Sequence, residues 1–472
     1  MFAGAYRPQG IFAGPAPRFA KESLPVREFF HSVTLDRDKC KGCINCIKRC
    51  PTEAIRVRDG KAVISPERCI DCGECIRICP HHAKLPIVDP LSVIDNFEYT
   101  IALPAPSLYA QFNNLEDTDV VLSALCDIGF DEVYEVARAA ELVSEATRRY
   151  LTRPDVQKPV ISSACPAVSR LIRVRFPELV DHVLPFVAPA ELAARLAKEE
   201  AVRVTGLAPE KIGAIFISPC PAKVTAMRMP LGSDKSWIDA VVAIKDIYPP
   251  LLHAMKKTKP RALADSGRIG IGWAESGGEA AGLISTERYL AADGIENVIK
   301  VLEDLEDEKL GELEFVELAA CAGGCVGGVL TVENPYIAKA KLKRLRRYLP
   351  VSRNHLGAAL PSEVLWDQPM EYQPVMELGA DATESFARYT EMQKLLAALP
   401  GLDCGSCGAP TCQALAEDIV KGEADFEDCV VLMRERMENV LKVLKIDKPG
   451  WGLAQKGTPA GQEEEEDTPH DD

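Results

Sequence analysis

The sequence predicts an α/β core with mostly parallel strands, flanked by an N-terminal α+β domain and a small, mainly helical C-terminal domain. Three observations support this fold class. The 472 residues suffice for about three domains. Sixteen of the 17 cysteines fall into three groups, at Cys40 to Cys79, Cys165 to Cys325 and Cys404 to Cys429. Between about residues 95 and 350, short apolar runs alternate with amphipathic helical patterns, as in α/β proteins.

The composition is that of a folded protein in water. Hydrophobic residues make up 47% and charged residues 26% of the chain, close to the average for globular proteins. The net charge of -15 repels phosphate backbones and anionic lipids, so we expect neither nucleic acid nor membrane as a partner. No uncharged apolar run approaches the roughly 18 residues of a membrane span, and the N-terminus lacks a secretory signal. We therefore expect a cytoplasmic protein.

The cysteine content indicates metal binding. Cytosolic thiols are kept reduced, and a chain of this size needs no disulfide framework. Only seven histidines are present, and none lies four residues from another histidine, so thiolate dominates the expected ligands. Soft thiolate ligands favour iron-sulfur clusters or zinc.

The first cysteine group consists of two copies of the run Cys-x2-Cys-x2-Cys-x3-Cys-Pro. Each copy is typical of a [4Fe-4S] site whose fourth cysteine reaches the cluster of the other copy. The expected ligand sets are therefore Cys40, Cys43, Cys46 and Cys79, which we name set one, and Cys50, Cys69, Cys72 and Cys75, which we name set two. The intervening AIRVRDGKAVIS predicts a hairpin that turns at Asp59-Gly60.

Residues 31–90 around this repeat resemble a bacterial-type ferredoxin domain. The alternative is a zinc ribbon. Zinc sites use pairs of Cys-x2-Cys rather than doubled four-cysteine runs that end in proline, so the spacing favours two [4Fe-4S] clusters.

The central group contains cysteines that follow strand-like runs. Cys165 follows PVISSA, Cys220 follows KIGAIFISP, and Cys321 and Cys325 follow FVELAA in the glycine-rich CAGGCVGG. Functional residues of parallel sheets gather at the carboxyl ends of the strands, so these four cysteines are expected to converge. Single buried cysteines are also common as small hydrophobic residues, which is the alternative for each.

The third group, LPGLDCGSCGAPTCQALAEDIVKGEADFEDC, has glycines that let the backbone close tightly around a cofactor. It resembles the small four-iron cluster domain found in electron-transfer subunits of anaerobes, with zinc as the alternative metal. The expected ligands, which we name set three, are Cys404, Cys407, Cys412 and Cys429. We expect this domain at residues 395–452.

The loops SSACPAVSRLIRVRFPEL, SPCPAK and ELAACAGGCVGG are similar, in order and separation, to the three signature loops of iron-only ([FeFe]) hydrogenases. The resemblance spans residues 95–350 and implies the iron-only hydrogenase fold with its H-cluster. It implies that Cys165, Cys220, Cys321 and Cys325 bind a [4Fe-4S] cubane. It further implies that Cys325 bridges to a diiron subsite with carbonyl, cyanide and dithiolate ligands, and that Lys223 contacts a cyanide.

The sequence departs from the catalytic members of this family at the first loop. In those members the residue before the first-loop cysteine is itself a cysteine that relays protons, whereas this chain has Ala164. Loss of a general acid or base typically costs about 10²- to 10⁴-fold in rate, so we expect low activity. Two further positions usually held by methionine are Ser218 and Ala319, and Ser163, Ser218 or Glu275 could form a substitute relay.

The domain order resembles that of hydrogen-sensing iron-only hydrogenases, some of which carry alanine before the first-loop cysteine. We expect an N-terminal arm at 1–30, a helical linker at 351–394 and a disordered acidic tail at 453–472. The expected function is reversible hydrogen oxidation and proton reduction, with electrons relayed through four [4Fe-4S] clusters: two in the ferredoxin domain, one in the H-cluster and one C-terminal. The alternative is a non-catalytic multi-cluster electron-transfer subunit of a larger redox complex.

The resemblance also implies partners. H-cluster maturation proteins would load the diiron subsite, and a soluble electron-transfer or signalling protein would receive the output, while the sequence leaves the oligomeric state open. Cys126 is expected to be a core residue of a helix, and His81 and His82 are expected to be solvated.

Overall fold

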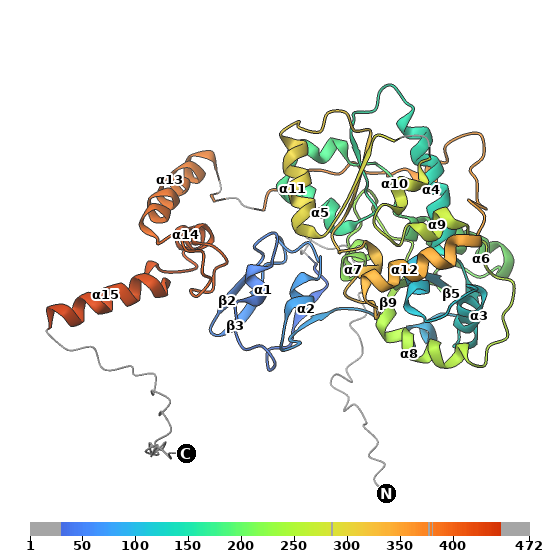
Figure 1. The fold of residues 1–472 in the computed structure, drawn as a ribbon, viewed down its shortest axis with the longest axis horizontal. Coiled ribbons are helices and arrows are strands. Elements are labelled where there is room, and N and C mark those ends of the chain that lie inside the picture. Colours follow the sequence, from blue (N-terminus) through green and yellow to red (C-terminus); the bar gives the residue numbers. More distant parts are fainter. Residues whose placement is uncertain (1–29, 285–286, 376–377, 380, 445–472) are drawn as a thin grey trace, which may run out of the picture.

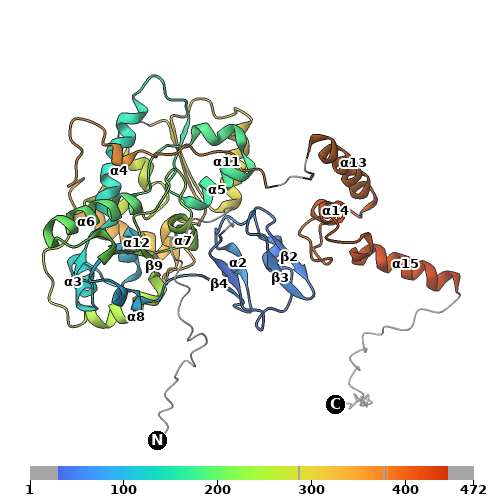
Figure 2. The same ribbon diagram turned by 180° about the vertical axis from the view of Figure 1, so that it is seen from behind.

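Three domains lie in a row in the computed structural model, which describes residues 30–284, 287–375, 378–379 and 381–444. Figures 1 and 2 show the N-terminal domain in blue between the central domain and the C-terminal helices in red. The expected arm at 1–30, apart from its last residue, and the expected tail at 453–472 lie outside the described residues.

The N-terminal domain has the expected α+β composition. Its elements are β1 (Val33–Leu35), α1 (Asn45–Lys48), β2 (Ile55–Arg58), β3 (Lys61–Ile64), α2 (Glu74–Ile78) and β4 (Lys84–Pro86). Strands β1 and β4 pair antiparallel, as do β2 and β3. The hairpin is confirmed, because Arg58 pairs with Lys61 and the φ angles of Asp59 and Gly60 are 51° and 69°. Two successive positive φ angles are the signature of a tight hairpin turn.

The central domain contains two parallel sheets, which confirms the expected α/β core. One has the order β6-β5-β8-β9, built from β5 (Tyr99–Pro104), β6 (Glu132–Val133), β8 (Ile212–Ser218) and β9 (Ala240–Ala243). The other has the order β10-β11-β7, built from β7 (Val160–Ile161), β10 (Tyr289–Asp293) and β11 (Phe315–Ala319). Every strand pair in both sheets is parallel.

Helices cover both faces of the larger sheet because its strands are apolar on both sides. All seven residues of β8 are buried. Ala214 and Phe216 face a core shared with α4 and α6, whereas Ile215 and Ile217 face a core shared with α3 and α8. The helices of this domain are α3 (Asp119–Asp127), α4 (Val136–Leu151), α5 (Pro166–Arg175), α6 (Pro189–Thr205), α7 (Pro221–Arg228), α8 (Ile244–Met255), α9 (Arg268–Gly272), α10 (Gly278–Gly282), α11 (Ile295–Glu306) and α12 (Pro335–Leu345).

Short 3-10 helices complete the connections. They are η1 (Leu91–Asn96), η2 (Pro106–Gln111), η3 (Pro177–His182), η4 (Pro209–Lys211), η5 (Cys325–Gly327), η6 (Arg346–Tyr348), η7 (Ser362–Val364) and η8 (Phe426–Asp428). The C-terminal domain contains α13 (Ala382–Ala398), α14 (Cys412–Val420) and α15 (Val430–Val443).

The expected helical linker at 351–394 differs from the structure in its first part. Over 351–375 the chain is irregular apart from η7, and helix begins only at Ala382. The irregular part is anchored on the central domain by Val364, which is buried in a core cluster, and by Trp366, which packs against another. Prolines at 361, 369 and 374 oppose helix formation there.

Two expectations outside the clusters have mixed outcomes. Cys126 lies in α3, as expected, but it is only half-buried and so is not a core residue. His81 and His82 are exposed, as expected. No helix within the described ranges is long and apolar enough to cross a bilayer.

We expect truncation of the β5 core to destabilise the central domain. Leu103 is fully buried, so Leu103→Ala should cost about 2–5 kcal/mol through lost burial and a residual cavity. Thermal unfolding followed by circular dichroism measures the effect. Val204→Ala is the matched control, because Val204 is 73% exposed; equal unfolding midpoints for the two variants would contradict this packing.

Candidate metal centres and active site

The structure brings the eight N-terminal cysteines into the two sets expected from their spacing. The Cys46 thiol lies close enough to interact electrostatically with Cys40, Cys43 and Cys79. The four cysteines of set two line one small cavity, together with Thr52 and Asp71. Each set thus combines three cysteines from one run with the last cysteine of the other run.

A buried lysine lies between these two sets. The Lys84 side chain is 2% exposed, and its Nζ has no hydrogen-bond partner in the described part of the chain. It acts electrostatically on Cys46 and Cys79 of set one and on Cys75 of set two. An unpaired buried ammonium is costly. Anionic clusters on either side would compensate its charge, so the residues present fit such clusters.

The four central cysteines line a single cavity at the strand ends of both sheets. Cys165 follows β7, Cys220 follows β8, and Cys321 and Cys325 follow β11. The Cys321 thiol interacts electrostatically with the thiols of Cys165, Cys220 and Cys325. The Cys220 thiol interacts with those of Cys165 and Cys325. The cavity is therefore built from three separate chain segments that converge only in the fold.

Two of these cysteines stand at helix N-termini. Cys165 precedes α5 and Cys220 precedes α7, and each is followed by proline at the first helical position. Proline is tolerated there because the first helical N–H groups have no intrahelical partner. The positive ends of both helix dipoles therefore face the cavity, although burial raises the pKa of the Cys220 thiol to about 12.

Glycines allow the third loop to close on the other segments. Gly324 has φ +87°, and a Cβ at this position would lie 2.4 Å from the backbone nitrogen of Ser276. A Cβ at Gly328 would lie 2.2 Å from the carbonyl oxygen of Pro219. Both contacts are with backbone atoms, so neither position accommodates a larger residue. The distance of Cys321 and Cys325 from the other two loops therefore depends on these two glycines.

Lys223 supplies a buried cation to this cavity. Its Nζ donates a hydrogen bond of 3.3 Å to the carbonyl oxygen of Ala164. Burial opposes its charge, but the surrounding thiols of the four central cysteines raise the net pKa of Lys223. A buried cation with unused donors fits an anionic ligand in the cavity.

Two buried glutamates line the same cavity and were not found by sequence reasoning. Glu279 Oε2 accepts a 2.6 Å hydrogen bond from the Ser162 hydroxyl, while its Oε1 has no partner among the described residues. Glu317 accepts backbone N–H bonds from Gly277 and Ala280. Burial, and for Glu279 the neighbouring Glu317, raise the pKa of both carboxyls. The only sequence signal was an acidic residue inside the otherwise apolar FVELAA.

The proposed substitute relay residues occupy less favourable places. Ser163 donates to the carbonyl oxygen of Phe186 and lines a neighbouring cavity. Ser218 is fully buried and donates to the carbonyl oxygen of Cys220. Glu275 lines the central cavity but is ion-paired with Arg346. Ala164 lines the central cavity, and its N–H donates to Ser162.

The C-terminal cysteines are also gathered. Cys412 begins α14, Cys429 precedes α15, and Cys407 interacts with Cys404 and Cys429. Within this set Cys429 is buried and Cys404 is exposed. The set therefore has one open edge.

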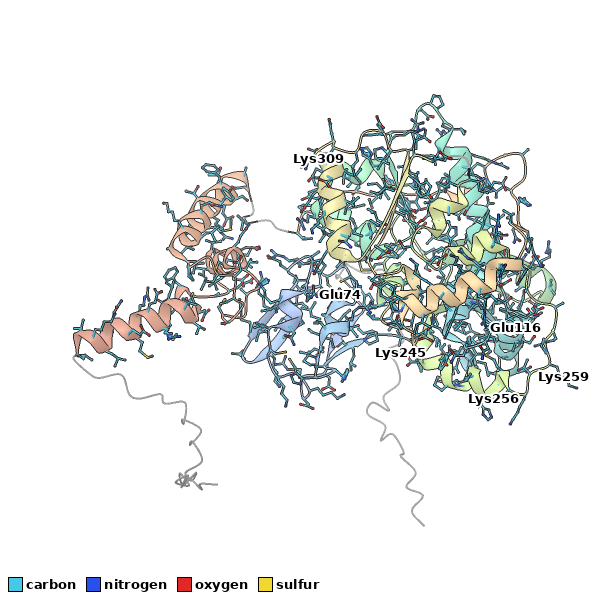
Figure 3. The ribbon with its side chains drawn as sticks, viewed as in Figure 1. Glu74, Glu116, Lys245, Lys256, Lys259 and Lys309 are labelled. Atoms are coloured by element: carbon cyan, nitrogen blue, oxygen red, sulfur yellow. The ribbon has the colours of Figure 1, made fainter. Side chains whose placement is uncertain are left out.

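Set two adjoins the central cavity. Asp71, between Cys69 and Cys72, accepts a 2.7 Å hydrogen bond from Thr225 of α7. Arg77 of α2 donates to the carbonyl oxygen of Gly327 and pairs with Glu74. Figure 3 shows Glu74 where the N-terminal domain meets the central domain.

A family model described as the C-terminal domain of the iron-only hydrogenase large subunit matches residues 98–254 and 276–329. The central part of the chain thus matches the large-subunit domain of the iron-only hydrogenases. A 4Fe-4S dicluster domain model matches residues 32–80, and an Fe-S cluster domain model matches residues 399–431. The chain therefore contains two domains of iron-sulfur type, and the N-terminal one is of the 4Fe-4S dicluster type.

Two curated members of the family are similar over long stretches. Iron hydrogenase 1 of Clostridium pasteurianum is 25% identical over 410 residues, which cover 70% of this chain and 71% of that protein. The periplasmic [Fe] hydrogenase large subunit of Nitratidesulfovibrio vulgaris is 30% identical over 213 residues, 41% of this chain. This chain spans 50% of the length of that second relative. The solved [FeFe]-hydrogenase HydA(deltaEFG) has a TM-score of 0.47 and 15% identity, covering 59% of this chain and 95% of that one.

We expect Glu279 to make stability depend on pH. Its pKa is raised in the folded state above the ordinary glutamate value, so the folded protein holds this proton more tightly than the unfolded chain. The resulting stability is fully present below the unfolded pKa and is lost as the pH rises through the folded pKa. Unfolding midpoints between pH 5 and 8 should fall more steeply for the wild type than for Glu279→Gln. Glu312→Gln, at an exposed position, should retain the wild-type slope.

Proposed function

We propose that this protein is an [FeFe] hydrogenase that interconverts hydrogen with protons and electrons slowly and acts as a hydrogen or redox sensor. The observation that supports it is the convergence of four cysteines, Lys223 and two buried glutamates on one cavity. We propose four [4Fe-4S] clusters, held by sets one, two and three and by Cys165, Cys220, Cys321 and Cys325. A diiron subsite held by Cys325 would supply the iron chemistry for hydrogen and, in its dithiolate ligand, a basic amine for the proton.

The residues of the chain divide the remaining tasks. Lys223 places a buried positive charge beside Cys220 and Cys325, where anionic ligands would be held. The apolar wall of Ala164, Ala319 and Phe216 limits access of water to the reacting position. Water exclusion strengthens each electrostatic interaction inside the cavity.

Glu279 is the group best placed to replace the missing relay at Ala164. Its raised pKa keeps a proton on the carboxyl at neutral pH, and its unpartnered Oε1 is free to exchange that proton. Ser162 connects Glu279 to the backbone of Ala164 through two successive hydrogen bonds. Ser163 is not part of this route, because its hydroxyl donates to the carbonyl oxygen of Phe186.

The sensing role follows from slow turnover combined with many redox centres. A protein that turns over slowly leaves its clusters in a redox state set by the hydrogen concentration, which a partner can read. We propose a cytoplasmic location, loading by H-cluster maturation proteins and a soluble electron-transfer or signalling protein as the recipient.

The decisive test is infrared spectroscopy of protein made anaerobically with the maturation proteins. We expect bands in the region where metal-bound carbonyl and cyanide absorb, and these should shift under hydrogen. Cys325→Ser, which removes the proposed bridge, should lack the bands. If the wild type lacks them while iron and sulfide analysis shows intact cubanes, the protein is instead a non-catalytic electron-transfer subunit.

The relay proposal predicts opposite effects at two positions. Ala164→Cys should raise hydrogen evolution because it adds a titratable group beside the cavity, whereas Glu279→Gln should lower it by about 10²- to 10⁴-fold. Both rates are measured by gas chromatography with a reduced dye as electron donor and are normalised to infrared band intensity. Glu312→Gln is the control. An unchanged rate in Glu279→Gln would sink the assignment of Glu279.

A further inference from the structure

A positive side chain lies at each junction between neighbouring cysteine sets. The row of domains places set three against the N-terminal domain and set two against the central cavity (Figures 1 and 2). Set three therefore lies beside the N-terminal domain, which holds sets one and two, and set two lies beside the central cavity. The three junctions contain Lys48, Lys84 and Arg77 respectively.

The outer junction is formed by Lys48, which lies at the end of α1, two residues after Cys46. Its Nζ donates hydrogen bonds of 2.7 Å to the carbonyl oxygen of Asp403 and 3.0 Å to that of Pro410. These carbonyls flank Cys404 and Cys407. The Lys48 ammonium thus stands where set three meets the N-terminal domain and acts electrostatically on Cys404.

Ion pairs hold the two domains together at this junction. Asp418 of α14 accepts a 2.7 Å bond from Arg56 and pairs with Arg58, and its side chain is 4% exposed. Arg68 pairs with the adjacent Glu417. Removing one partner of a buried pair leaves an uncompensated charge, so these contacts define how α14 sits on the N-terminal domain.

The backbones are also in direct contact. The N–H of Val57 donates a 2.8 Å hydrogen bond to the carbonyl oxygen of Gly408. A Cβ at Gly408 would lie 2.1 Å from the carbonyl oxygen of Val57. The loop of set three is thus laid on the edge of β2, and the position of Lys48 where set three meets the N-terminal domain is fixed.

The middle junction is formed by Lys84, which is buried between set one and set two and has no hydrogen-bond partner in the ranges described. The inner junction is formed by Arg77, which binds the carbonyl oxygen of Gly327 and acts electrostatically on Cys321. All three cations belong to the N-terminal domain. None of them contributes a ligand to the proposed clusters.

We propose that Lys48 and Lys84, which have no acidic partner among the ion pairs of the described residues, act as electrostatic spacers that reduce the repulsion between neighbouring reduced clusters, so that the protein holds several electrons at once. The proposal deepens the function proposed above and rests on the cysteine sets holding cubanes. At each junction one electron passes: the donor cluster is oxidised by one electron, the acceptor is reduced by one, and no bond or proton changes.

The reason is Coulombic. A [4Fe-4S] cluster with four thiolate ligands is an anion, and each added electron makes it more negative. Two unit charges a few ångströms apart in a protein interact by several kcal/mol at low effective dielectric, so a cation between two anions matters most when both are reduced. Without the cation, it is harder to reduce one cluster when its neighbour is already reduced.

The test uses full-length protein made without the maturation proteins, so that it contains cubanes but no diiron subsite. Redox titration followed by electron paramagnetic resonance measures the potential at which each cluster is reduced. In Lys84→Met the second electron taken up by the N-terminal domain should require a more negative potential, with the first little changed. In Lys48→Met the reduction potential of the C-terminal cluster should likewise become more negative. In Lys48→Arg, which keeps the positive charge, this potential should match the wild type.

Salt separates these two positions. Lys48 is exposed, so its effect should shrink at high ionic strength, whereas the effect of the buried Lys84 should persist. Lys259→Met is the control, because Lys259 is exposed and Figure 3 shows it at the end of the central domain away from the N-terminal domain. Its titration should match the wild type.

Potentials that stay at wild-type values in both Lys84→Met and Lys48→Met, with full iron content, would overturn the proposal. If Lys84→Met loses iron, the Lys48→Met variant alone is the test. A shift in the reduction potential of its C-terminal cluster supports the proposal, and an unchanged potential overturns it. The measurement does not depend on hydrogenase activity. Absence of the infrared bands would end the hydrogenase proposal and leave the spacer result standing.

Discussion

The mutual repulsion of closely spaced thiolates is the constraint on which this structure depends. Sixteen cysteines are gathered in four places, and each gathering is unfavourable unless positive charge or dipole lies beside it. The central cavity has two helix N-termini and Lys223. The N-terminal sets share Lys84, and the C-terminal set has Lys48. The surrounding fold holds these lysines and helix N-termini at fixed positions beside the cysteines.

The central cavity differs from the other three because it also contains acid. Glu279 and Glu317 lie where burial raises the pKa of each carboxyl, in the same cavity as the four central cysteines. One cavity thereby holds carboxyl groups that can carry a proton and cysteines that can hold a redox centre. A site that only transfers electrons needs the cysteines but not the carboxyl groups. The presence of Glu279 and Glu317 therefore favours an enzyme over an electron carrier.

Local signals in the sequence were sufficient for the features that depend on short spacing. The cysteine runs, the turn at Asp59-Gly60 and the strand ends before Cys165 and Cys220 were all predicted, because each is determined by neighbouring residues. Glu279 and Lys84 were missed because their importance comes from what surrounds them. A glutamate near glycines and a lysine at the start of a strand are expected to be solvated, whereas the fold buries both. The linker at 351–375 was mistaken for helix because its tertiary anchors, such as Trp366, leave no periodic pattern.

The ion pairs between α14 and the N-terminal domain join residues far apart in the chain. Arg56 and Asp418 are separated by 362 positions, and domains generally fold from the N-terminus as the chain is synthesised. Arg56 and Arg58 of β2 therefore cannot pair with Asp418 until residue 418 has been synthesised. The contact between the N-terminal domain and α14 can form only after the intervening central domain has been made.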